Sequence, residues 1–134
     1  MNREIEFRAW LKAYKQMTKV LNIDFKLNAV HIPKIGMSYS MQFFEDIELM
    51  QYTGLEDKNG VKIFEGDIMK IWYDFETEYY EQKTLVSKGV VKFDKGMFTV
   101  KFEGYNYYIN ADGLKLEVIG NIYENKELLG DKNE

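Results

Sequence analysis

The chain has no cysteine, a single histidine and a single proline among its 134 residues. The absence of cysteine excludes disulfide bonds and thiolate metal sites, and it is compatible with a reducing cytoplasm. One imidazole, that of His31, cannot form a zinc site that needs several histidines. His31 lies among apolar neighbours in AVHIP, so we interpret it as a structural residue. The composition therefore predicts no cofactor and no metal.

Long apolar segments are also missing. A membrane-spanning helix needs roughly 20 consecutive apolar residues, and no stretch approaches that length. The first ten residues, MNREIEFRAW, carry acids and lack the apolar segment of a signal peptide. We therefore expect a cytoplasmic protein with no membrane partner.

Positive charge is in deficit. The chain has 18 basic and 22 acidic side chains, and its net charge is −4. Nucleic-acid binders usually present a basic patch that displaces counterions from phosphates, and the sequence shows no such patch. A protein partner, or a second copy of the chain, is therefore expected in preference to nucleic acid.

Alternation of apolar and polar residues is the main pattern that is present. It predicts strands with one solvated face over residues 5–9, 21–27, 98–102 and 114–118. The turn Asp94-Lys95-Gly96 predicts a hairpin between residues 89–93 and the strand that follows. These elements indicate antiparallel sheets.

Helical patterns are few. Residues 10–17 fit either a helical turn or a long hairpin loop, and residues 123–129 fit a short helix with Asn125 as its N-cap. The predicted fold class is mainly β (α+β at most), with antiparallel sheets, a C-terminal SH3-like barrel and few short helices. We expect one domain over residues 1–134, with an N-terminal sheet layer at 1–48 and a barrel-like part at 49–130.

Three segments together suggest a family. They are REIEFRAW at residues 3–10, LMQYTGLEDKNGVKIFEGDI at 49–68 and LEVIGNIYENKELL at 116–129. Their order and spacing resemble the YopX family, whose members are encoded mainly by bacteriophages and prophages. The resemblance implies a β-rich phage protein and gives no catalytic residues to transfer.

Glu65 and Asp67 are the candidate catalytic pair. Paired carboxylates serve acid–base or metal chemistry only with a neighbour that separates their pKa values or with further oxygen ligands. Both flank Gly66, so we interpret them as solvated, turn-stabilising residues and expect no enzyme. The alternative is a metal-dependent hydrolase that uses Glu65 and Asp67.

The segment WYDFETEYYE at residues 72–81 is the candidate binding surface. It predicts an exposed strand or hairpin arm, or a docking surface for a basic protein, with a DNA mimic as a further alternative. Alternation places the acids Asp74, Glu76 and Glu78 on one face and the rings of Tyr73, Phe75 and Tyr79 on the other. The scattered methionines, among them Met41 and Met50, are interpreted as core residues. The predicted function is a phage accessory protein that acts by protein–protein binding or self-assembly.

Overall fold

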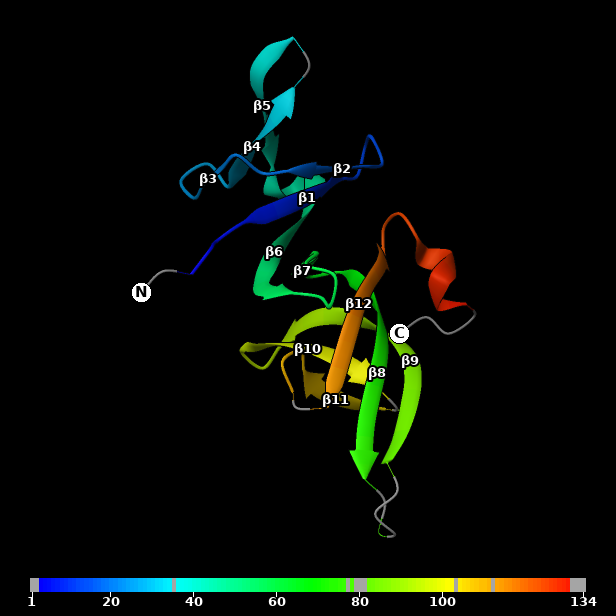
Figure 1. Cartoon of the computed structure of the whole chain (residues 1–134). Helices are drawn as coiled ribbons and strands as arrows, with labels where there is room; N and C mark the ends of the chain where they lie inside the picture. The colour runs from blue at the N-terminus through cyan, green and yellow to red at the C-terminus, as the bar shows by residue number, and fades with distance from the viewer. Residues whose placement is uncertain are drawn as a thin grey trace. The chain divides into compact units, whose positions relative to one another are not determined.

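The computed structural model describes residues 3–34, 36–76, 78, 82–102, 104–111 and 113–130. The contacts between residues divide the chain into two compact units, Met1–Tyr52 and Thr53–Glu134. Both units contain strands (Figure 1). The helices of the described part of the chain are two short 3-10 helices. The prediction of a mainly β, antiparallel fold is confirmed. Within the described residues, no helix combines the length and apolar character needed to cross a bilayer.

The first unit contains two antiparallel sheets. One joins β2, β1 and the first part of β6, and the other has the order β3-β4-β5. The elements are β1 (Phe7–Leu11), β2 (Gln16–Lys19), β3 (Asn22–Asp24), β4 (Ala29–Lys34), β5 (Met37–Phe43), the 3-10 helix η1 (Phe44–Asp46) and β6 (Ile47–Glu56).

Alternation places the core of this unit between its two sheets. In β1 and β4 the buried residues Ala9, Leu11, Val30 and Ile32 form one apolar cluster with Ile47 of β6. Inward positions therefore follow a period of two, as expected for strands with one buried face. The second face of the β3-β4-β5 sheet is left outside this cluster.

In the first unit, one prediction needs correction and one open alternative is resolved. The strand expected at residues 21–27 covers only β3, because the Asp24 side chain accepts the N–H groups of Lys26 and Leu27 at 2.9 and 3.0 Å and turns the chain. Asn28 completes the reversal at φ 53°. The open alternative at residues 10–17 resolves to a hairpin between β1 and β2, with Lys15 at φ 50°.

The second unit is built on a five-stranded antiparallel sheet with the order β11-β10-β9-β8-β12. In Figure 1 this sheet curls into a half-barrel, and β7 pairs with the end of β6. The SH3-like comparison remains a prediction. The elements are β7 (Lys62–Phe64), β8 (Asp67–Glu76), β9 (Gln82–Asp94), β10 (Met97–Phe102), β11 (Tyr105–Tyr108), β12 (Leu114–Asn121) and the 3-10 helix η2 (Lys126–Leu129).

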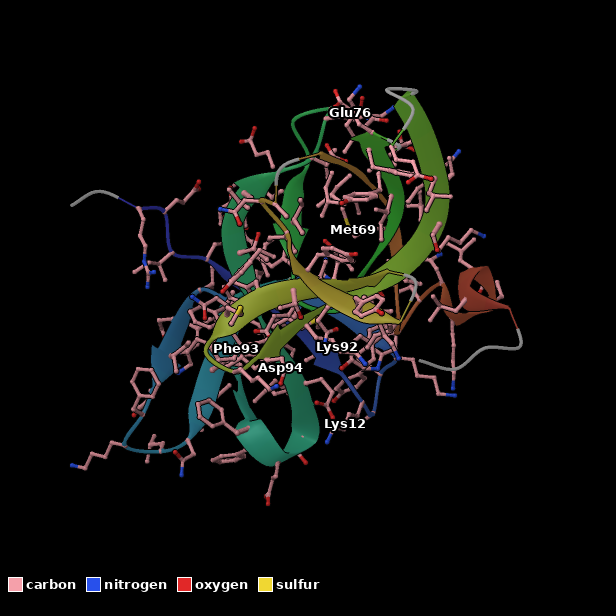
Figure 2. The ribbon with its side chains drawn as sticks, turned by 90° about the horizontal axis from the view of Figure 1, so that it is seen from below. Lys12, Met69, Glu76, Lys92, Phe93 and Asp94 are labelled. Carbon is pink, nitrogen blue, oxygen red and sulfur yellow. The ribbon has the colours of Figure 1, made fainter. Side chains whose placement is uncertain are left out.

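The core of the second unit is centred on β8. Met69 and Ile71 are fully buried, together with Val91 and Val100. Each such side chain contributes roughly 1.5–3 kcal/mol through its removal from water. Figure 2 shows Met69 among the strands and Glu76 at the end of β8. The predicted hairpin at Asp94-Lys95-Gly96 is confirmed, with Lys95 and Gly96 both at positive φ.

β12 and the tail after it each contain an irregular feature. The register of β12 against β8 shifts between Val118 and Gly120. The predicted helix at residues 123–129 is a single 3-10 turn, and Asn125 makes no capping bond with its side chain. Instead, the Asn125 side-chain oxygen accepts the N–H of Asn121 at 3.1 Å.

Candidate functional site

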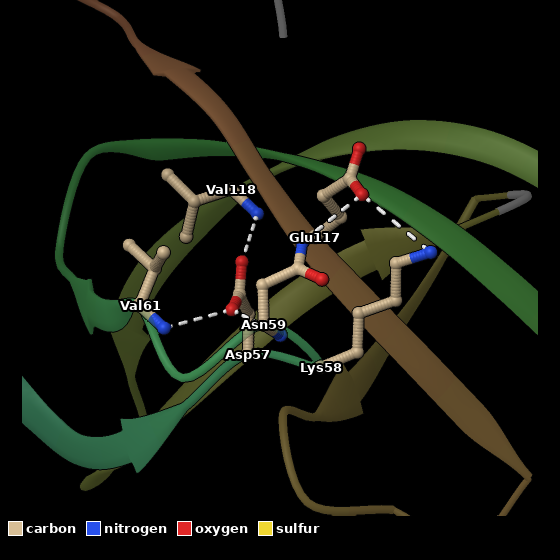
Figure 3. A network of polar contacts seen from close by, with 6 residues as sticks. All are labelled: Asp57, Lys58, Asn59, Val61, Glu117 and Val118. Carbon is tan, nitrogen blue, oxygen red and sulfur yellow. Dashed lines mark hydrogen bonds and ion pairs between the residues drawn. The ribbon is translucent and has the colours of Figure 1, made fainter.

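The turn after β6, at the centre of the chain, is organised by Asp57. Its Oδ1 accepts the N–H groups of Asn59 and Val61 at 2.8 and 2.9 Å, and its Oδ2 accepts the N–H of Val118 at 2.9 Å. Figure 3 shows these bonds converging on one carboxylate that is 8% exposed. The carboxylate therefore joins the turn after β6 to β12.

The same contacts set the protonation of Asp57. Burial raises the pKa of this carboxyl, but the N–H bonds from Val118, Val61 and Asn59 and the charge of Lys58 together outweigh burial, so that the pKa lies below the ordinary aspartate value. Glu117 extends the network by accepting the Asn59 amide at 3.3 Å and pairing with Lys58 at 3.5 Å. The carboxylate stays ionised in a structural role.

Asp67 is also turned inward. It is 1% exposed, and its Oδ2 accepts the N–H of Phe64 at 2.8 Å across the turn that contains Gly66. Gly66 adopts φ 83°, which favours glycine. The predicted turn-stabilising role is confirmed for Asp67, because its carboxylate accepts the N–H of Phe64. Its predicted solvation is wrong, because the residue is buried. Glu65 is partly exposed.

The described residues contain no group of three or more His, Cys, Asp or Glu side chains arranged to hold a metal ion. One contact of the Asp67 carboxylate is the bond that its Oδ2 accepts from the backbone N–H of Phe64, which ties the carboxylate to the turn.

The candidate surface on β8 is divided between two faces, as alternation predicts. The rings of Tyr73 and Phe75 stack with centroids 5.8 Å apart, and Tyr73 also meets Tyr107 of β11 at 5.7 Å. Tyr73 and Tyr107 pack against the core of the second unit. These two tyrosines therefore lie partly buried at the rim of the core.

The acids of β8 lie on the solvated side. Asp74 is exposed, accepts the hydroxyl of Thr84 at 2.6 Å and lies 3.9 Å from the ammonium of Lys115. Glu76 is exposed at the end of the β8–β9 hairpin, and Glu78 is exposed in the turn beyond it. Tyr79 lies outside the described residues. The hairpin arm is confirmed, and its role in binding remains a prediction.

Sequence reasoning missed an apolar face in the first unit. Tyr39, Met41 and Phe43 alternate along β5, and they are 52%, 40% and 44% exposed. The loop between β3 and β4 contributes Leu27, which is 51% exposed and lines the same hollow as Phe43. We call these four residues, Tyr39, Met41, Phe43 and Leu27, the β5 face. The interpretation of Met41 as a core residue is wrong, whereas that of Met50, which is 3% exposed, is confirmed.

A histidine ring and an open hollow lie beside the β5 face. His31 of β4 lies against Tyr39 with ring centroids 4.7 Å apart, and its Nδ1 contacts the side-chain oxygen of Asn22. An open hollow of about 530 Å³ adjoins the face, lined by Leu27, Phe43 and Phe44 together with Asn28 and Glu45. The signal that could have identified this face is the alternation in SYSMQF, which contains no charge to mark a solvated side.

Comparison with known proteins agrees with the sequence motifs. The model of the family described as YopX protein matches residues 6–130. The crystal structure of protein EF1440 from Enterococcus faecalis is similar to this chain, with 30% identity and a TM-score of 0.60, over 96% of this chain and 99% of that one. No curated protein matches the chain. Family match and structural neighbour both span nearly the whole sequence, and the chain therefore belongs to the YopX family.

Proposed function

We propose that this YopX-family protein is a phage or prophage accessory protein that acts by binding another protein in the cytoplasm of the host cell, without catalysing a reaction. The single observation that carries the proposal is the β5 face. Its four residues, Tyr39, Met41, Phe43 and Leu27, are exposed by 52%, 40%, 44% and 51%. With about 150–200 Å² for each large apolar side chain, they present roughly 300 Å² of apolar surface to solvent.

A patch of this size calls for a partner. Monomeric proteins rarely expose larger contiguous apolar patches than a few hundred Å², and the patches of that size that they do expose are often functional. Aromatic residues and methionine are also the residue types enriched at protein interfaces. Tyr39, Met41 and Phe43 fit that composition, and all three are on one strand.

The carboxylates support a binding protein more than a hydrolase. Asp57 and Asp67 both accept backbone N–H groups, so that each holds a turn. The acids Asp74, Glu76 and Glu78 on the β8–β9 arm form a second candidate contact surface, which would suit a basic protein. Their negative charge argues against a nucleic-acid partner there.

The test is affinity capture with a matched pair of variants. The tagged wild type, Met41→Lys and Val86→Lys are each recovered from phage-infected host cells. Val86 is a suitable control because it is an apolar strand residue of similar exposure, 54%, outside the β5 face. We expect a co-purifying chain that is retained by the wild type and by V86K and lost by M41K. With purified proteins, this chain should bind the wild type and V86K and not M41K. Identical recovery with all three proteins would contradict the proposal.

A further inference from the structure

A hollow of about 530 Å³ lies at the end of the β5 face, where β5 passes into η1. Its apolar lining consists of Leu27, Phe43 and Phe44, and its polar groups come from Asn28 and Glu45. Sites that hold a ligand commonly measure roughly 300–1,000 Å³. The hollow therefore has room for a long side chain of a partner.

The walls of the hollow are held in place by the first unit itself. The N–H of Leu27 donates to the Asp24 carboxylate at 3.0 Å, and the N–H of Phe44 donates to the backbone oxygen of Asn28 at 2.8 Å. Phe44 also packs against the core of the unit. A partner thus meets walls that are already ordered, which lowers the entropic cost of binding.

Among the described residues of the lining, Glu45 carries the charge. Within the described part of the chain, its carboxylate makes no hydrogen bond or ion pair. The ammonium of Lys12 donates to the backbone oxygen of Glu45 at 3.2 Å and pairs with Glu48 at 3.4 Å. Neither Lys12 nor the exposed Lys26 lines the hollow. The negative charge of Glu45 is therefore left for a cation of the partner.

The chemistry of this lining favours arginine. Apolar walls with one carboxylate among them match a side chain that has an apolar stem and a cationic end. The planar guanidinium of arginine binds a carboxylate through two parallel hydrogen bonds and stacks on aromatic rings such as that of Phe43, whereas the lysine ammonium acts as a point charge. Arginine is also enriched at protein interfaces and among the residues that contribute most to their affinity.

We propose that the partner is a protein segment that inserts an arginine side chain into this hollow, with its guanidinium on Glu45, while apolar residues beside the arginine cover the β5 face. This inference deepens the proposed function by giving the chemistry of the partner, and it rests on that function. The apolar face supplies the contact area, and the charge pair fixes where the segment lies on it.

A pair of short peptides tests the insertion directly. The probes are acetyl-Leu-Arg-Phe amide and acetyl-Leu-citrulline-Phe amide, which has a side chain of the same shape without the charge. Each is titrated into the isotope-labelled full-length chain, and binding is followed by NMR. We expect the arginine peptide to shift the amide signals of Leu27, Asn28 and Phe44. The citrulline peptide should bind at least about threefold more weakly, because it cannot form the ion pair.

Matched variants of the protein test the role of the carboxylate. Glu45→Gln keeps the length of the side chain and removes its charge. Asp46→Asn is the control, because it removes one negative charge from an exposed neighbour that does not line the hollow. The arginine peptide should bind E45Q at least about threefold more weakly than the wild type and bind D46N like the wild type. The preference for arginine over citrulline should disappear in E45Q, and circular dichroism checks that both variants are folded.

Three results would overturn the inference: no binding of the arginine peptide, equal affinity of the wild type for both peptides, or an equal loss of affinity in E45Q and D46N. Capture of the co-purifying chain separates this failure from that of the proposed function. If Met41→Lys loses the chain and Glu45→Gln retains it in full, only the arginine is wrong. If neither substitution affects capture, the proposed function is wrong as well.

Discussion

Removal of the Asp57 carboxylate tests the role of this residue in holding the second unit together. The perturbation is Asp57→Ala, with Asp57→Asn as a milder companion. The carboxylate accepts three backbone N–H groups at 2.8–2.9 Å, from Asn59, Val61 and Val118. Alanine leaves all three without this acceptor, whereas asparagine keeps one acceptor oxygen and loses the charge.

The magnitude follows from these bonds. A hydrogen bond to a charged group contributes about 1.5–3 kcal/mol, and contributions from one network are not additive. The three bonds are only partly buried, which lowers their value. We therefore expect Asp57→Ala to lower the free energy of unfolding of the second unit by about 2–4 kcal/mol and Asp57→Asn by about 1–2 kcal/mol.

The effect should depend on pH with a definite sign. The pKa of Asp57 is lowered in the folded chain, so its contribution is present above the unfolded value, near pH 4 for aspartate, and is lost as the pH falls through the lower folded pKa. The difference in stability between the wild type and Asp57→Asn should thus be constant from pH 7 to about pH 5 and shrink below pH 4.

The assay uses the two tryptophans. Trp10 lies in the first unit and Trp72 in the second. Urea unfolding followed by fluorescence in a Trp10→Phe background reports the second unit, and a Trp72→Phe background reports the first. Asp94→Asn serves as the matched control, because Asp94 is an exposed turn residue of the same unit. Equal stability of D57A and wild type at pH 7, or an unchanged gap below pH 4, would refute the reasoning.

Two further perturbations probe the packing of β9 and the tail. Gly89→Ala should lower the free energy of unfolding by about 1–3 kcal/mol, because an added Cβ would lie 2.4 Å from the backbone oxygen of Lys101. The measurement is the thermal unfolding midpoint, which should fall. An unchanged midpoint would show that β9 and β10 can separate there. Asn121→Ala should cost about 1–2 kcal/mol, because the Asn121 side-chain oxygen accepts the N–H groups of Tyr123 and Glu124 at 3.0 and 2.9 Å. Amide hydrogen exchange at residues 123 and 124 measures this loss, and protection equal to that of the wild type would contradict it.

Local signals in the sequence predicted local structure. Glycine and asparagine turns and alternation located the β9–β10 hairpin, the bend at Gly66 and the mainly β class. The sequence did not predict the reversal at Asn28 and did not decide between the two alternatives for residues 10–17, because Asn28 and Lys15 are non-glycine residues at positive φ. Such residues are uncommon there, so the sequence gives no warning.

Long-range contacts could not be predicted. Nothing in the turn at Asp57 indicates that its carboxylate would bind a residue 61 positions later. The inward turn of Asp67 and the outward position of Met41 have the same cause, because alternation shows that a strand has two faces and does not show which face is buried. The alternation of β5 could therefore be recognised in the sequence, whereas the exposure of its apolar side chains could not.

The bond between Asp57 and Val118 also bears on how the protein is made. Val118 follows Asp57 by 61 residues, which at 5–20 residues per second corresponds to a delay of about 3–12 s on the ribosome. Throughout that interval the nascent turn has only its own two N–H groups to hold the carboxylate. A polypeptide released early, before β12 emerges, would carry an incomplete half-barrel with apolar strands uncovered, and it would be open to proteolysis.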